Sequence, residues 1–386
     1  MGAMLSTPSG GGSPPRARAV TLLDGVVRAE RSDVRARRCS PAAALPALMA
    51  ACVALAGCSG GSGASPASSG APSITAPSSV GQAPDASSAP PHQQAQALTA
   101  SVAPFRLPAM LSRAVAYPAG TRLLVATGLH DADRSTGAVL DIDLAGNHVT
   151  VAGRLPQAVH DAAGALLGGM PTTFGGGASS EAATIQQFVP AHRTARTAGA
   201  LPVPTSDAVA ASTDAGVVVA GGYDGSRTLP QVLLLTAPDR VRTLSPLPVR
   251  VRYPAVAVTG SGAGQRVLLF GGESGGVATT AVQEIDPASG SVRVVAHLPA
   301  ARTQAMAVSL GGTVFVAGGA AAGTSGAQVF DDVLRYDPAV HTFNNAGRLP
   351  YPTSDAAVAV LGERAYLVGG ETPARTDRTI VLAPAS

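Results

Sequence analysis

The chain has the sequence Val-Phe-Val-Ala-Gly-Gly at residues 314–319, an apolar run that ends in a glycine pair. Runs of five to seven residues bounded by Gly, Pro and Asp suit β-strands and are too short for helices. The paired glycines allow the backbone to turn through positive φ angles. Another apolar run, Val333 to Tyr336, follows and ends at Asp337-Pro338. The segment therefore predicts consecutive strands of one small sheet.

The same unit recurs six times. A Leu-Pro dipeptide marks each copy, at Leu107-Pro108, Leu155-Pro156, Leu201-Pro202, Leu247-Pro248, Leu298-Pro299 and Leu349-Pro350. Glycine pairs recur in step at 175–176, 221–222, 271–272, 318–319 and 369–370, with Thr127-Gly128 in the first copy. Each copy predicts four short strands, of which the first, innermost one in the last copy runs from Asp355 to Val360. A period of this length in a β-rich chain is typical of a propeller.

These glycine pairs resemble the kelch repeat, in which paired glycines end the second strand of each blade. The resemblance covers residues 97–386 and implies an all-β, six-bladed kelch-like β-propeller. The last copy stops at Ser386 without a fourth strand, whereas residues 101–108 align with the fourth-strand segment 343–350. We expect residues near 99 to 106 to complete the last blade, because a closed ring protects its strand edges.

The N-terminus predicts an export signal. Arginines 35, 37 and 38 precede an apolar run from Pro41 to Gly57, which is short for a membrane span. The final residues, Leu55-Ala56-Gly57-Cys58, resemble the bacterial lipobox, which implies that residues 1–57 are removed and that Cys58 is acylated. Two acyl chains would anchor the protein durably to the extracytoplasmic face of the cell membrane. The alternatives are a signal cleaved without lipid and an uncleaved anchor.

Composition separates the leader from the body. Residues 1–57 hold seven arginines against three acidic residues, so the excess positive charge that makes the pI basic lies in the leader. The rest of the chain is not basic, which argues against a nucleic-acid partner. Residues 58–96 are rich in Gly, Ser, Ala and Pro and predict a disordered tether. The complete absence of lysine, with abundant Ala and Gly, suggests a high-GC bacterial genome and excludes lysine chemistry.

Motifs for catalysis and cofactors are lacking. G-x-S-x-G occurs at residues 57–61 and 272–276, but neither match has the strand-turn-helix context of a nucleophile elbow. The seven histidines form no H-x-H or H-x-x-x-H pair, and Cys58 is the last cysteine in the chain. The sequence therefore predicts no catalytic residue, no metal site and no cofactor.

One polar constellation follows from the repeat. Six residues after each leucine of Leu-Pro stand Arg113, Asp161, Asp207, Tyr253, Gln304 and Asp355. Equivalent positions of a ring converge on its axis, so we expect these side chains to form a polar collar at one mouth of the central channel. Such a collar could bind a cation or another small polar ligand. The loops after the glycine pairs, including His130-Asp131, Tyr223-Asp224 and Glu273-Ser274, should share that face. The alternative is structural: each residue caps its turn or hydrogen-bonds a neighbouring blade.

Three functions fit these observations. The first is a lipid-anchored, non-catalytic binding or scaffolding module at the cell envelope, with an unknown envelope protein or small polar ligand as its partner. The second follows from the resemblance, since some bacterial kelch proteins are sialic acid isomerases or act on polysaccharides. Sugar sites usually contain aromatic stacking surfaces, and the absence of Trp weighs against this alternative. The third is a purely structural envelope protein.

Overall fold

A computed structural model describes residues 97–323 and 326–385. The expected leader, Cys58 and the tether lie outside these residues and stay predictions. The described part consists of strands and three short 3-10 turns, η1 (Asp131–Asp133), η2 (Pro190–His192) and η3 (Gly262–Gly264). None of its helices is long and apolar enough to span a membrane.

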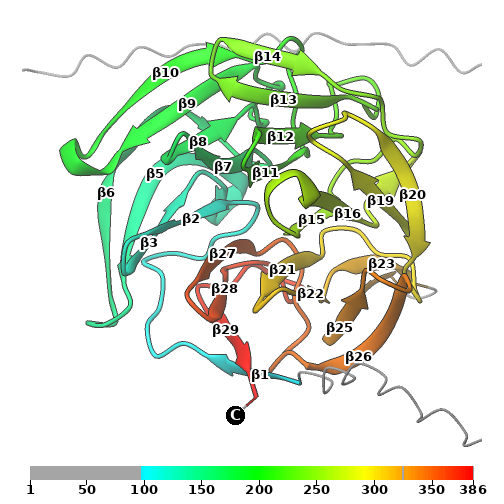
Figure 1. Ribbon diagram of the computed structural model, residues 1–386. Helices are drawn as coiled ribbons and strands as arrows, with labels where there is room; N and C mark the ends of the chain where they lie inside the picture. Colours follow the sequence, from blue (N-terminus) through cyan, green and yellow to red (C-terminus); the bar gives the residue numbers. More distant parts are fainter. Residues whose placement is uncertain (1–96, 324–325, 386) are drawn as a thin grey trace, which may run out of the picture. The chain divides into compact units, whose positions relative to one another are not determined.

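Six antiparallel sheets surround a central axis as the blades of a propeller (Figure 1). From the axis outward, blade 1 contains β2 (Val115–Ala119), β3 (Arg122–Ala126), β5 (Arg134–Asp143) and β6 (His148–Val159). Blade 2 contains β7 (Ala163–Leu167), β8 (Met170–Phe174), β9 (Thr184–Val189) and β10 (Thr194–Ala200). Blade 3 contains β11 (Val209–Thr213), β12 (Gly216–Ala220), β13 (Val232–Ala237) and β14 (Arg240–Thr243).

The second half repeats this order. Blade 4 contains β15 (Ala255–Thr259), β16 (Arg266–Phe270), β19 (Ala281–Ile285) and β20 (Val292–His297). Blade 5 contains β21 (Met306–Leu310), β22 (Thr313–Ala317), β25 (Asp332–Asp337) and β26 (Thr342–Arg348). Blade 6 contains β27 (Ala357–Leu361), β28 (Arg364–Val368), β29 (Thr379–Pro384) and β1 (Leu98–Val102). Short strands in the loops after the glycine pairs are β4 (Leu129–His130), β17 (Glu273–Ser274), β18 (Val277–Ala278), β23 (Ala320–Gly323) and β24 (Gly326–Val329).

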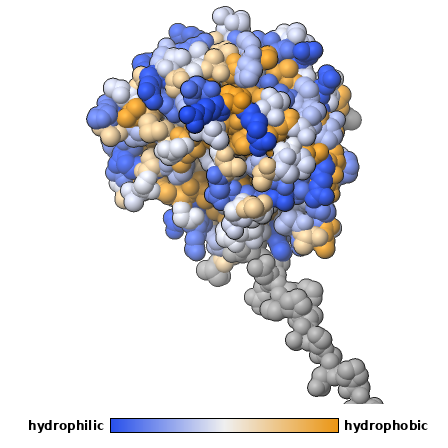
Figure 2. All heavy atoms as spheres, turned by 45° about the horizontal axis from the view of Figure 1, so that its top comes forward, coloured by the Kyte–Doolittle hydropathy of each residue, from blue (hydrophilic) through white to orange (hydrophobic). Residues whose placement is uncertain are grey.

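The core lies between neighbouring blades. The second strand of each blade is buried on both faces, as in β22, where Val314, Phe315 and Val316 have no exposed surface. Each boundary between blades has its own apolar cluster; Phe315 and Leu367, for example, pack together between blades 5 and 6. On the face in Figure 2, hydrophobic residues are interleaved with hydrophilic ones. Burying one large apolar side chain contributes about 1.5–3 kcal/mol to stability, so the apolar clusters between the blades hold neighbouring blades together.

The glycine pairs are needed because a neighbouring blade approaches them closely. In blade 5, Gly318 and Gly319 have φ angles of 61° and 95°, and the N–H of Gly319 donates to the carbonyl of Thr353, 2.9 Å away, in blade 6. A β-carbon on Gly318 would overlap that carbonyl oxygen. The second glycine of every blade donates the same hydrogen bond to the next blade, at 2.8–2.9 Å. The pair therefore provides both the turn and the space for inter-blade contact.

The predicted ring closure is confirmed, because β1 pairs with β29 as the outermost strand of blade 6 (Figure 1). Its boundaries differ from the predicted 99 to 106. The Ala103 N–H still donates to Thr379 (2.8 Å), but Pro104 has no N–H and ends the ladder. Pairing resumes at Leu107, whose N–H donates to Asp377 at 2.9 Å. Leu98 and Phe105 are buried beside the last blade.

A chain that begins at Leu107 should therefore be less stable than one that begins at Gln94. The shorter chain loses β1 and the buried side chains of Leu98 and Phe105, which contribute ~3–6 kcal/mol together. At ~2–4 °C per kcal/mol, its melting temperature should fall by roughly 10 °C. Thermal unfolding followed by circular dichroism measures the difference. Equal melting temperatures would contradict closure by β1.

Candidate functional site: the axial collar

The six sequence-predicted collar residues lie together. Arg113, Asp161, Asp207, Tyr253, Gln304 and Asp355 all line one cavity of about 130 Å³. Each stands two residues before an innermost strand, so the cavity sits where the six innermost strands begin. We refer to these six residues as the collar. Their proposed role in ligand binding stays a prediction.

The collar backbones form a closed ring of hydrogen bonds. Each collar N–H donates to the carbonyl of the collar residue in the preceding blade, at 2.8–3.1 Å, and the Arg113 N–H closes the ring on Asp355 at 3.0 Å. All six residues have left-handed φ angles between 51° and 59°, although none is glycine. This conformation costs ~1–2 kcal/mol per residue, which the ring hydrogen bonds help to offset. The predicted start of the last innermost strand, Asp355, was wrong: β27 begins at Ala357, because the left-handed conformation of Asp355 is not compatible with a strand.

The backbone of each collar residue thus hydrogen-bonds a neighbouring blade, as the structural alternative supposed. The collar residues still line the cavity. Arg113 lies between blades 6 and 2, as expected from its place in the repeat. Its Nη1 is 3.2 Å from Asp161 Oδ2, and its Nε is 3.4 Å from Glu371 Oε1. The Ser112 hydroxyl also donates to Glu371 Oε1, at 2.9 Å. Arg113 thus balances part of the negative charge at this mouth.

A second arginine, Arg252, was not singled out from the sequence. Its guanidinium is 3.6 Å from Asp207 and 2.7 Å from Glu273, and it lies over the rings of Tyr223 and Tyr253 at 5.1 and 5.2 Å. The repeat does contain a signal for this contact. The residue before each collar position pairs with the residue after the glycine pair in all six blades, and Arg252 pairs with Glu273 in this way.

The loops after the glycine pairs were expected to share this face, and Tyr223 and Glu273 do so. His130, named in the same expectation, instead lines a separate lateral pocket in blade 1. Glu371 follows the last glycine pair and was missed, although the same spacing identifies it. Among the described residues, no group of three or more His, Cys, Asp or Glu side chains is arranged to hold a metal ion.

Burial raises the pKa of all three collar carboxyl groups. The pKa of Asp161 rises to about 6 because burial outweighs the charge of Arg113. The pKa of Asp207 rises to about 7 because burial acts together with the negative charge of Asp161. Burial also places the pKa of Asp355 well above its ordinary value, and its buried Oδ2 has no hydrogen-bond partner among the described residues. The collar therefore holds carboxyl groups whose charges are incompletely compensated.

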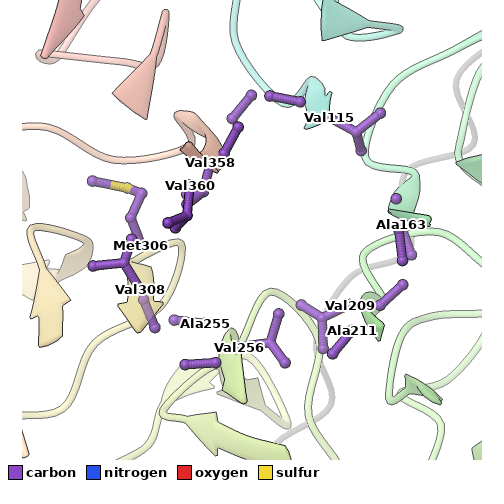
Figure 3. Close-up of a pocket in the computed structure, with 18 of the residues that line it drawn as sticks. Val115, Ala163, Val209, Ala211, Ala255, Val256, Met306, Val308, Val358 and Val360 are labelled. Carbon is purple, nitrogen blue, oxygen red and sulfur yellow. The ribbon is translucent and has the colours of Figure 1, made fainter. Parts of the chain in front are cut away.

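An apolar channel of about 510 Å³ continues from the collar along the axis. Figure 3 shows its lining, in which Val209, Val256, Val308 and Val358 come from four different innermost strands. Ala208, Ala305 and Ala356 line both the collar cavity and the channel, so the two spaces adjoin. The site thus combines a charged mouth with an apolar interior.

The raised pKa of Asp207 predicts how stability depends on pH. Between pH 4 and pH 7 the folded protein keeps a proton on Asp207 that the unfolded chain has lost, so stability should fall as the pH rises through this window. The raised pKa of Asp207 corresponds to a loss of at most ~4 kcal/mol in the free energy of unfolding across this window. Asp207→Asn should flatten the dependence and raise the melting temperature at pH 8. Melting curves at pH 5 and pH 8 test this, with Asp331→Asn, beside the exposed Arg348, as the control.

Comparisons with known proteins agree with this architecture. No protein-family model matches the chain. Kelch-like protein 35 of Mus musculus is 30% identical over 151 residues, which cover 39% of this chain and 24% of the mouse protein. The chain thus matches about a quarter of that relative's length. A solved structure described as "Structure of YjhT" superimposes with a TM-score of 0.61 at 15% identity, covering 71% of this chain and 95% of the other. The described chain has the fold of a six-bladed kelch-like β-propeller.

Proposed function

We propose that this protein is a non-catalytic binding module, anchored by lipid at the cell envelope, and that its collar binds a small organic amine. The fold supports a binding or scaffolding module or a propeller enzyme, and the collar supports the first of these. An envelope protein that carries or presents the amine is a compatible partner. The proposal concerns the full chain, including the expected lipid on Cys58.

The observation that carries this proposal is the charge imbalance at the collar. Asp161, Asp207 and Asp355 line the cavity, while Glu371 pairs with Arg113 and Glu273 pairs with Arg252 beside it. Two guanidinium groups thus face five carboxyl groups. Burial raises the pKa values of these three carboxyl groups, and more positive charge nearby would be needed to offset its effect. An ammonium group would supply that charge and provide a donor to the unpartnered Oδ2 of Asp355.

The adjoining channel favours an amine over a bare ion. Its valine and alanine side chains accept aliphatic carbon, and a volume of about 510 Å³ is in the range of small-molecule sites. The ammonium group would lie at the collar and the carbon chain would extend into the channel. The absence of a metal-binding cluster among the described residues is consistent with this preference.

A carbohydrate-active enzyme is the second candidate. Carboxyl groups with pKa values near 6 and 7 could exchange protons with a substrate near neutral pH, which favours this alternative. Against it, Arg252 lies over the rings of Tyr223 and Tyr253 at the collar, which leaves less aromatic surface for a sugar to stack on. Turnover of a sugar by the wild-type protein, lost in Asp207→Asn, would support the enzyme instead.

Membrane attachment rests on sequence alone. The apolar run ending at Gly57, the lipobox-like residues before Cys58 and the polar tether form the order expected of an exported lipoprotein. These residues lie outside the described part of the chain. The tether would hold the propeller away from the membrane, where its collar could meet a soluble ligand.

The amine proposal is tested by substituting two collar carboxyl groups. Spermidine should raise the melting temperature of the wild-type protein, because a ligand that binds only the folded state stabilises it. Asp161→Asn combined with Asp207→Asn should fold but lose most of this stabilisation. Because more carboxyl groups ionise at high pH, the wild-type effect should be larger at pH 8 than at pH 5.

Calcium and Asp331→Asn serve as controls. Calcium should stabilise the wild type less than spermidine does, and Asp331→Asn, which changes a partly buried carboxylate paired with Arg348 outside the collar, should respond as the wild type does. The proposal fails if no amine shifts the wild-type melting temperature. It also fails if the double variant keeps the full shift.

Lipid attachment is tested separately through Cys58. Cys58→Ala should remove the acceptor for the acyl chains, so the protein should leave the detergent phase or accumulate as an uncleaved precursor. Metabolic labelling with palmitate and phase partitioning measure both outcomes. A variant that stays with membranes at the mature size would show that another segment anchors it. The folded propeller should be unaffected in either case.

A further inference from the structure

Blade 1 departs from the repeat at the glycine pair, where Thr127 occupies the first position. The other five blades have glycine there. Thr127 has a φ angle of 64°, inside the left-handed region. A β-branched residue in this region is strained, because its side chain crowds the backbone. Strain of this kind persists where the surrounding structure enforces it, and it is often associated with a functional role.

The hydroxyl group of Thr127 is buried without a partner, as are those of Tyr351 and Thr379 in the described residues. Thr127 is only 1% exposed, and its Oγ1 has no hydrogen-bond partner in the described part of the chain. The nearby hydroxyl groups are partnered: Ser135 Oγ lies 2.8 Å from His160 Nδ1, and Thr136 Oγ1 accepts the N–H of Ala138 at 3.1 Å. Buried polar groups almost always have partners, so a free hydroxyl at a strained residue suggests that a ligand supplies one.

Thr127 faces a lateral pocket of about 270 Å³ that is separate from the central channel. The pocket lies between the segment Pro108–Leu111, which enters blade 1, and strands β3, β5 and β6 of that blade. Its lining is mainly apolar, with Met110 and Val151 exposed by 47% and 57%. Exposed apolar side chains beside an apolar pocket are typical of small-molecule sites.

Blade 5 shows how large side chains can fill the equivalent space. Arg302, the counterpart of Leu111, is 1% exposed and bonds Asp332 through both terminal guanidinium nitrogens, at 2.9 and 3.1 Å. Its guanidinium also lies 4.4 Å from the centre of the Phe330 ring. Two flat groups, a guanidinium and a phenyl ring, therefore stack in this part of blade 5.

Backbone hydrogen bonds establish which residues of blade 1 are equivalent. Thr136 donates to Gly128 as Phe330 donates to Gly319, at 2.9 and 2.8 Å. By the same spacing, Ala138 replaces Asp332. Blade 1 therefore keeps the backbone of blade 5 but has Leu, Thr and Ala where blade 5 has Arg, Phe and Asp. The small side chains of blade 1 leave open the space that a guanidinium group and a ring fill in blade 5.

We propose that this pocket binds a single aromatic ring carrying one hydrogen-bonding oxygen, such as a phenol. The ring would occupy the space that the stacked guanidinium and phenyl groups fill in blade 5. Its hydroxyl group would exchange a hydrogen bond with Thr127 Oγ1. An apolar cavity of about 150 Å³ is large enough for benzene, so about 270 Å³ admits a substituted ring. This site is independent of the collar.

The test compares p-cresol with toluene, which has the same ring and methyl group but no hydroxyl. Ligand-observed NMR with the full chain should show p-cresol binding at least tenfold more tightly than toluene. Thr127→Val keeps the shape of the side chain and removes the hydroxyl, so it should abolish the preference while toluene still binds. Ala138→Phe places a ring inside the pocket and should prevent both from binding.

Two controls separate this site from the rest of the protein. Val340→Phe changes a residue that is 64% exposed in blade 5 and should leave both affinities unchanged. The double variant Asp161→Asn with Asp207→Asn should bind p-cresol as the wild type does. The proposal is overturned if p-cresol does not bind or if Thr127→Val retains the preference. The comparison of p-cresol with toluene in the wild type and in Thr127→Val tests the proposal even if Ala138→Phe does not fold.

The phenol could be a free molecule or the side chain of a tyrosine in another protein. A blocked Gly-Tyr-Gly peptide distinguishes these sources because it presents the same ring on a backbone. Tighter binding of the peptide than of p-cresol supports a tyrosine ligand. Binding of p-cresol with exclusion of the peptide supports a free small molecule.

Discussion

The closed ring of backbone hydrogen bonds at the collar is the constraint on which the rest of the propeller depends. Six residues, one per blade, must adopt left-handed φ angles so that each N–H meets the carbonyl of the preceding blade. A parallel set of hydrogen bonds, from the second glycine of each blade to the next, requires that the blades approach closely. Both sets close only if the sixth blade meets the first, and the pairing of β1 with β29 completes that sixth blade.

The same ring determines where function can reside. Because the collar backbones are committed to one another, their side chains are brought around a single cavity whatever their identity. Here that position gathers three carboxyl groups and an arginine, and burial keeps the pKa values of the acids high. Neighbours outside the strict repeat position, Arg252 and Glu371, then set how much of the charge is compensated. The backbone holds the ring together, and the side chains are the groups to which we assign the proposed recognition of a ligand.

Variation between blades is tolerated because the backbone hydrogen bonds do not depend on the side chains beside them. Blade 5 fills one inter-strand space with Arg302, Phe330 and Asp332, whereas blade 1 leaves the corresponding space open beside Thr127. The two blades nevertheless make equivalent backbone contacts. A repeat protein can in this way acquire distinct pockets in individual blades without altering the ring.

The sequence by itself determined the number of blades, the closure of the ring and the identity of the collar, because each follows from a period that appears directly in the residue order. The ends of strands were less certain, since Pro104 and the left-handed Asp355 interrupt pairing through local geometry. Only the tertiary structure decided that Arg252 reaches Asp207 and that Thr127 has a buried, unpartnered hydroxyl group. Burial and pairing depend on residues that different strands bring together in space, and no local pattern records that proximity.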